Sequence, residues 1–144
     1  MVLRSLSLGT YFAGPSDIMA KILIVDDQPE ICELLSTLFS SNTMVKTSRS
    51  LEEAVLALSQ HNFDLVISDL SLKGRNGTEG FELLSHIRSK SPSTEVIIMT
   101  GSGTDEIKKN AIRLGAAHFF EKPIDTRSLL SQVNTILGGN HNGG

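Results

Sequence analysis

Two kinds of apolar segment alternate along the chain. Short runs such as Ile22-Leu23-Ile24-Val25 and Val96-Ile97-Ile98-Met99 are apolar at every position, which is typical of parallel strands covered on both faces. Longer segments carry apolar residues three or four positions apart, as at Ile31, Leu34 and Leu38, and this spacing places them on one helix face. The pattern predicts alternating strands and helices. The strands are expected at residues 22–25, 44–47, 64–68, 96–99 and 116–120, and the helices begin near residues 29, 51, 81, 104 and 126.

Residues with known capping roles mark several of the predicted helix boundaries. Pro29 suits the first turn of a helix, and Ser50 with Glu53 forms the Ser-x-x-Glu capping box. Asp125 precedes the last helix at a position where its side chain can accept backbone N–H bonds. Gly115 stops the fourth helix. These signals support the boundaries that the apolar pattern predicts.

The alternation of strands and helices predicts an α/β fold. It implies a parallel sheet with helices on both faces, which gives three layers, and right-handed crossovers leave few topologies. The small solution is the doubly wound, five-stranded, flavodoxin-like sheet with strand order 2-1-3-4-5. In that order the first, third, fourth and fifth strands are neighbours. Their carboxyl ends carry Asp26-Asp27, Asp69, Thr100 and Lys122, which we expect to line one cleft.

The residues expected in this cleft suit phosphoryl chemistry. Three carboxylates close together repel one another unless they take up protons or bind a cation, and Mg²⁺ prefers oxygen ligands of this kind. Lys122 adds a compact positive charge for a phosphoryl oxygen, and Thr100 adds a hydroxyl donor. Together they describe a site that places a phosphoryl group on a carboxylate. Asp69 is the predicted nucleophile, because it ends the central strand and stands alone.

Each of these residues also has an ordinary interpretation. Asp26 or Asp27 can cap the first helix, Thr100 can be a turn residue, and Lys122 can be a solvated surface charge. Taken singly, these interpretations are the commoner ones. Taken together, they require a coincidence at every one of these strand ends, so we reject them. The histidines show no metal-ligand spacing, and none is interpreted as a phosphate donor.

A set of short motifs follows in order along the chain, each at a strand end. The motifs are Val25-Asp26-Asp27, the strand from Asp64 to Asp69, Thr100-Gly101-Ser102-Gly103, Gly115-Ala116 and Lys122-Pro123. Each is weak alone, but the ordered set is specific and resembles the receiver domain of two-component response regulators. The resemblance covers residues 20–137. It implies a bacterial, cytoplasmic signalling protein that accepts a phosphoryl group.

The resemblance implies a role for each acid. Asp69 would accept the phosphoryl group from a phosphohistidine of a sensor kinase or of a histidine phosphotransfer protein. Asp26, Asp27 and Asp69 would hold Mg²⁺ together with the backbone carbonyl of Ser71, and Asp27 would bind it most directly. Such a protein catalyses its own phosphorylation and its own dephosphorylation. We therefore expect a phosphoacceptor rather than a turnover enzyme.

The resemblance also implies a switch. Lys122 would neutralise the acyl phosphate, Thr100 would move to hydrogen-bond a phosphoryl oxygen, and Phe119 would turn inward on activation. Phosphorylation would then shift an equilibrium between inactive and active conformations. The face formed by residues 104–137 would bind a downstream protein target, and the chain could also form a homodimer. No nucleic-acid or membrane partner is expected.

The chain departs from the family pattern after Asp69. Leu72-Lys73 stands where Met-Pro is usual, and the glycine that usually precedes the next helix is assigned to Gly80. This assignment makes the loop longer than is common, and we expect it to be more mobile, with effects on kinase choice and phosphate lifetime. Phe119 replaces the commoner Tyr, which removes a hydroxyl and keeps the ring.

Rival functions use related features. A haloacid-dehalogenase-type phosphatase needs a second acid two residues after its nucleophile, where this chain has Ser71. A flavodoxin-like or nucleotide-binding protein needs a phosphate-binding loop after the first strand, but Asp26-Asp27-Gln28-Pro29 is acidic and repels phosphate. An adaptor that keeps the receiver fold and works without phosphorylation stays open as an alternative. So does a receiver segment of a hybrid histidine kinase.

Composition narrows the class without identifying the partners. With 144 residues the chain is one domain, and its net charge of −3 gives no nucleic-acid footprint. The single cysteine, Cys32, suits a reducing compartment and is interpreted as a packing residue. No apolar stretch approaches transmembrane length. We expect a loose extension over residues 1–18, a receiver domain over 19–138 and a flexible tail over 139–144, and we favour a stand-alone receiver.

Overall fold

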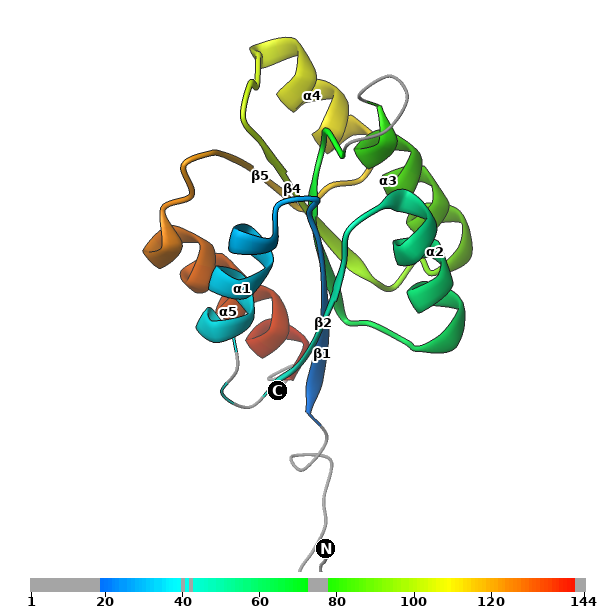
Figure 1. Cartoon of the computed structure of the whole chain (residues 1–144), viewed down its shortest axis with the longest axis vertical. Helices are drawn as coiled ribbons and strands as arrows, with labels where there is room; N and C mark the ends of the chain where they lie inside the picture. Colours follow the sequence, from blue (N-terminus) through cyan, green and yellow to red (C-terminus); the bar gives the residue numbers. More distant parts are fainter. Residues whose placement is uncertain (1–18, 40, 42, 73–77, 142–144) are drawn as a thin grey trace, which may run out of the picture.

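The computed structural model describes residues 19–39, 41, 43–72 and 78–141. Within these residues it contains the alternating strands and helices that the apolar pattern predicts (Figure 1). The extension expected over residues 1–18 lies outside the described part of the chain. The elements are β1 (Ala20–Val25), α1 (Pro29–Leu38), β2 (Thr43–Ser48), α2 (Leu51–Gln60), β3 (Leu65–Asp69), α3 (Glu79–Lys90), β4 (Glu95–Thr100), α4 (Asp105–Arg113), β5 (His118–Glu121) and α5 (Thr126–His141).

The strands form one parallel sheet in the order β2-β1-β3-β4-β5, which confirms the predicted topology. The register places Ile24 of β1 beside Ile67 of β3, and Ile67 beside Ile97 of β4. Because all the strands run in one direction, their carboxyl ends meet at one edge of the sheet. Figure 1 shows α1 and α5 on one side of the sheet and α2 and α3 on the other.

Side chains that alternate along the strands fill two cores. Ile22 and Ile24 of β1 belong to the core beneath α1 and α5, whereas Leu23 and Val25 belong to the core shared with α2, α3 and α4. All four of these side chains are closed off from solvent. A strand buried on both faces needs apolar residues at every position, which explains the uninterrupted apolar runs in the sequence.

The helix boundaries follow the predicted capping signals. Oγ of Ser50 accepts the backbone N–H of Glu53 at 3.1 Å, and the Glu53 carboxylate accepts the N–H of Arg49 at 2.8 Å, so the two side chains cap the start of α2. Asp125 Oδ1 accepts the backbone N–H of Ser128 at 3.2 Å. This bond, with a second one from the Ser128 hydroxyl, lowers the pKa of Asp125 below its usual value. Asp125 therefore caps α5 as predicted.

Several boundaries differ from the prediction by one or two residues, and those of β5 and α5 have a visible reason in the structure. β5 begins at His118 rather than at residue 116, because the N–H of Ala116 bonds back to the carbonyl of Ala111 at 3.0 Å and continues the last turn of α4. α5 runs to His141, so part of the tail expected over residues 139–144 is helical. A side chain at Gly138 would meet open space, and glycine there lowers helix propensity without ending the helix.

Candidate functional site

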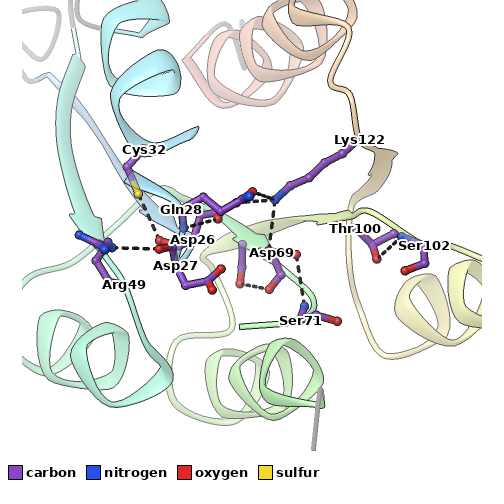
Figure 2. Close-up of polar contacts among 11 residues, drawn as sticks. Asp26, Asp27, Gln28, Cys32, Arg49, Asp69, Ser71, Thr100, Ser102 and Lys122 are labelled. Atoms are coloured by element: carbon purple, nitrogen blue, oxygen red, sulfur yellow. Dashed lines mark hydrogen bonds and ion pairs between the residues drawn. The ribbon is translucent and has the colours of Figure 1, made fainter. Parts of the chain in front are cut away.

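Three carboxylates meet at the carboxyl edge of the sheet. Asp69 is the last residue of β3 and is 5% exposed. Asp26 and Asp27 follow β1, where Asp26 is 0% exposed and Asp27 is half-buried. One oxygen atom from each carboxylate lies within 4.8 Å of the others (Figure 2). The structure thus brings together the acids that the sequence predicts to share a cleft.

Backbone contacts fix Asp69 at this edge. The N–H of Leu70 donates to the carbonyl of Met99 at 2.7 Å, and the N–H of Gly80 donates to the carbonyl of Leu70 at 2.9 Å. The N–H of Ser71 donates to Asp69 Oδ1 at 3.2 Å, which orients the carboxylate. The turn after β3 is therefore held by β4 on one side and by the start of α3 on the other.

Gly80 has a different role from the one predicted. It is the second residue of α3 rather than a residue before the helix. A Cβ atom at Gly80 would lie 2.5 Å from Cα of Leu70, so only glycine lets the helix approach the turn this closely. The predicted longer, more mobile loop includes residues 73–77, which lie outside the described residues. Leu72, at the start of this loop, is buried in the core beneath α2 and α3.

The turn between β1 and α1 holds Asp26 in place. The N–H of Asp26 donates to the carbonyl of Ser48 at 3.1 Å, and Asp26 Oδ1 accepts the N–H of Gln28 at 2.9 Å. The thiol of Cys32 donates to the backbone carbonyl of Asp26 at 3.3 Å. Burial, with the negative charge of Asp26 as a second cause, raises the pKa of this thiol. Cys32 is buried and packs in the core, as predicted.

Arg49 reaches the same turn from the end of β2. Its Nε donates to the backbone carbonyl of Asp27 at 3.2 Å (Figure 2). This contact is not predicted from the sequence, because it depends on the reach of the Arg49 side chain from the neighbouring strand. A basic residue directly after β2, the strand beside β1, is the sequence signal that could have predicted a contact with the acidic turn. Arg49 therefore positions the peptide group of one predicted metal ligand.

Lys122 supplies the positive charge of the site. Its Nζ lies 2.8 Å from Asp26 Oδ2 and 3.2 Å from Asp69 Oδ2, and the ammonium also donates to Gln28 Oε1 at 3.2 Å. The backbone N–H of Lys122 donates to the carbonyl of Thr100 at 2.8 Å, which holds the segment after β5 against β4. The role of Gln28 is not predicted from the sequence, because only the reach of its long side chain brings it to Lys122.

The charges at this edge are unequal. Burial raises the pKa of Asp69 above its usual value; the charge of Lys122 lowers it in part, and the charge of Asp26 raises it again. Burial alone would lower the pKa of Lys122, but its hydrogen bond to Asp26 and the charge of Asp69 raise that pKa above its usual value. One ammonium does not offset three acids. The oxygen donors that remain suit a hard divalent cation such as Mg²⁺.

Thr100 and Phe119 flank the loop between β4 and α4. Thr100 is 2% exposed, and its Oγ1 accepts the N–H of Ser102 at 3.2 Å. Phe119 is half-buried and packs against the core on the side of α2 to α4, whereas Phe120 packs against the opposite core. A Cβ atom at Gly103 would lie 3.0 Å from the ring of Phe119. The Phe119 ring therefore lies against this loop.

An open cleft lies over the acids. Its lining includes Gln28 after β1, Asp69 and Ser71 after β3, Gly101 after β4, and Lys122 after β5. A group that enters the cleft would therefore meet the ends of these strands together. Carboxylates and a lysine line this cleft, and this arrangement suits the transfer of a phosphoryl group to a carboxylate.

A doubly wound sheet with these acids, a threonine and a lysine at its carboxyl edge defines the receiver class of signalling proteins. The family model described as the response regulator receiver domain matches residues 22–134. The chain belongs to this family, the receiver domains of two-component systems. The fold and the family that the sequence motifs indicate are confirmed.

Similar sequences come from larger regulatory proteins. The response regulator protein PilR of Pseudomonas aeruginosa is 35% identical over 118 residues, which are 81% of this chain and 26% of PilR. The transcriptional regulatory protein FixJ of Azorhizobium caulinodans is 30% identical over 116 residues, which are 80% of this chain and 54% of FixJ. The chain therefore spans about a quarter of the length of PilR and about half that of FixJ.

Solved structures of receiver domains share the fold. A CheY-like response regulator receiver domain protein from Methanospirillum hungatei JF-1 aligns with a TM-score of 0.80 at 25% identity, over 88% of this chain and 100% of that chain. The BeF3-activated DrrB receiver domain aligns with a TM-score of 0.75 at 28% identity, over 84% of this chain and 99% of that chain. The likeness thus covers whole receiver domains.

Proposed function

We propose that Asp69 accepts a phosphoryl group from a phosphohistidine of a sensor kinase or a histidine phosphotransfer protein. The observation that carries this proposal is the position of the Lys122 ammonium, which contacts both Asp26 and Asp69 beside the third acid. An oxygen of Asp69 forms the new O–P bond while the N–P bond of the phosphohistidine breaks. The electron pair of that bond returns to the imidazole nitrogen, which takes up a proton.

The reaction is proposed to depend on Mg²⁺. The carboxylates of Asp26, Asp27 and Asp69 and the backbone carbonyl of Ser71 are the proposed ligands, and the acids already lie within 4.8 Å of one another. Bound there, the cation would neutralise charge on both the acids and the incoming phosphoryl group. Lys122 contributes the second positive charge, and the N–H of Ser71 keeps Asp69 oriented.

The output is proposed to be a change of protein partner. Thr100 would give up the N–H of Ser102 and bond a phosphoryl oxygen, and Phe119 would follow the loop between β4 and α4 inward. The face over residues 104–137 would then bind a downstream protein, and exposed apolar side chains on it at Ile112 and Leu114 support this role.

None of the described helices combines the length and apolar content that a membrane crossing requires.

Intact mass spectrometry tests the phosphoryl acceptor directly. Incubation with phosphoramidate, which has the N–P bond of the natural donor, should add one phosphoryl group when Mg²⁺ is present. Asp69→Asn should abolish the gain, while Asp64→Asn, directly before the same strand, should keep it. A gain that survives Asp69→Asn would contradict the assignment of the nucleophile. No gain in the folded wild-type protein would instead favour an adaptor that works without phosphorylation.

A further inference from the structure

The ammonium of Lys122 has no spare hydrogen-bond donor among the described residues. A lysine ammonium carries three N–H donors. Asp26 Oδ2 accepts at 2.8 Å, Asp69 Oδ2 at 3.2 Å and Gln28 Oε1 at 3.2 Å. Figure 2 shows the side chains of these residues converging on the Lys122 nitrogen. A phosphoryl oxygen that approaches Lys122 must therefore displace one of these acceptors.

The three acceptors differ in how easily they can leave. Asp26 is closed off from solvent, and its carboxylate is held by the N–H of Gln28 as well as by Lys122. Asp69 must stay in place, because it is the nucleophile of the proposed reaction. The Gln28 carboxamide is neutral and belongs to an exposed residue, so its bond to the ammonium lacks the attraction between opposite charges that holds the two carboxylates. The Gln28 side chain is therefore the acceptor that is displaced most easily from the ammonium.

The backbone of Gln28 does not have to move when its side chain leaves. Its N–H donates to Asp26 Oδ1 at 2.9 Å, and its carbonyl accepts the N–H groups of Ile31 at 3.1 Å and Cys32 at 3.3 Å. These contacts fix the turn that precedes α1. The side chain lines the same cleft as Asp69 and Lys122. Only side-chain rotation is needed to release the ammonium.

We propose that Gln28 is a positioning residue that holds Lys122 in the unphosphorylated protein and competes with the incoming phosphoryl group for its ammonium. Gln28 thereby limits the rate at which Asp69 is phosphorylated. This regulation rests on the proposed function of Asp69. The contact between the carboxamide and the ammonium exists without phosphorylation, so it can be tested separately.

The rate of phosphorylation by phosphoramidate at saturating Mg²⁺ tests the competition. Gln28→Met keeps nearly the same volume and loses the strong acceptor, so it should speed phosphorylation by about threefold to tenfold, the scale of one hydrogen bond. Gln28→Glu should slow it, because a carboxylate holds the ammonium more tightly and repels the anionic donor. Gln60→Ala, an exposed glutamine at the end of α2, should keep the wild-type rate.

A purely structural role would give a different pattern. If Gln28 only fills space, Gln28→Met would keep the wild-type rate while Gln28→Ala would change it, and this result would overturn the proposal. In a Lys122→Met background, Gln28→Met should have no further effect on the residual rate, because the contact is already absent. An equal gain in both backgrounds would show that Gln28 acts through another group and would also overturn it.

Nuclear magnetic resonance tests the contact without any phosphoryl transfer. In unphosphorylated protein, Lys122→Met should shift the side-chain amide signals of Gln28 and leave those of Gln60 unchanged. Unshifted Gln28 signals would contradict the proposed contact even if phosphorylation proceeds normally. If the Gln28 signals shift but the wild-type protein accepts no phosphoryl group, the contact is supported and the function proposed for Asp69 is rejected.

Discussion

One aspartate, Asp64, directly precedes β3 and another, Asp69, ends it, and the two are held in different ways. Asp64 is exposed, and its carboxylate accepts the backbone N–H of Lys21 at 2.8 Å. Its own N–H donates to the carbonyl of Lys21 at 2.8 Å, and its carbonyl accepts the N–H of Glu95 at 3.0 Å. Asp64 therefore ties three strands together at the amino edge with ordinary, neutral donors.

Asp69 sits among like charges at the carboxyl edge. It is buried, its pKa is raised by burial and by the charge of Asp26, and it shares one ammonium with that residue. At the amino edge the carboxylate of Asp64 joins strands, whereas at the carboxyl edge the charged oxygens remain available to a ligand in the cleft. This domain therefore concentrates its electrostatic cost at one edge, and the rest of the sheet supplies the stability.

The largest expected effect comes from the apolar layer between the two edges. Ile97 in β4 is fully buried beside Ile67 of β3. Ile97→Ala should lower the free energy of unfolding by about 2–5 kcal/mol, the range for a large buried aliphatic side chain that leaves a cavity. Chemical denaturation measures this loss. Met44→Ala, at a residue that is 53% exposed, is the matched control and should change stability little. An equal loss of stability in both variants would contradict the division between a stabilising interior and a costly edge.

Sequence patterns predict the parts of this molecule that depend on local periodicity. The uninterrupted apolar runs give the strands, and the rule that ligands gather at strand ends places Asp26, Asp69, Thr100 and Lys122 at one edge. The start of β5 was predicted two residues too early, because the apolar pattern continues through Ala116 while its N–H still belongs to the last turn of α4.

The contacts of Gln28 and Arg49 could not be predicted in the same way. They depend on the reach of long side chains between segments that are 94 and 22 residues apart in sequence. No periodic pattern records where such a side chain ends. The close approach of Gly80 to Leu70 is similar, because it depends on how tightly α3 packs against the turn after β3. Strand-end rules therefore predict which residues meet but not which neighbours restrain them.

Binding of Mg²⁺ should relieve the repulsion at the carboxyl edge. A ligand that binds only the folded state at one hundred times its dissociation constant adds about 2.7 kcal/mol to the free energy of unfolding. We expect thermal denaturation to show an increasing melting temperature with Mg²⁺ concentration. Asp27→Asn should remove most of this increase, whereas Asp64→Asn should preserve it. A melting temperature that ignores Mg²⁺, or that rises equally in Asp27→Asn, would place the cation elsewhere.

The smallest expected effect is the difference between substitutions of Asp64 and Asp69 without metal. Asp69→Asn removes a buried charge and should raise the free energy of unfolding at neutral pH, because the cost of burying this charge exceeds the stabilisation that Lys122 provides. Asp64→Asn should change stability less, since the amide oxygen can still accept the N–H of Lys21. Urea denaturation of both variants and the wild type measures the difference. A loss of stability in Asp69→Asn at neutral pH would show that its ion pair with Lys122 outweighs burial.

The pH dependence of that difference identifies its cause. Because burial raises the pKa of Asp69 in the folded protein, the folded state holds this proton more tightly than the unfolded state. The stability contributed by Asp69 therefore falls as the pH rises from the ordinary pKa of an aspartate towards the raised pKa of Asp69. The advantage of Asp69→Asn should be complete above the raised pKa and should shrink as the pH falls through it. An advantage that stays constant with pH would have to come from packing, and the carboxyl edge would then carry no charge-dependent cost at Asp69.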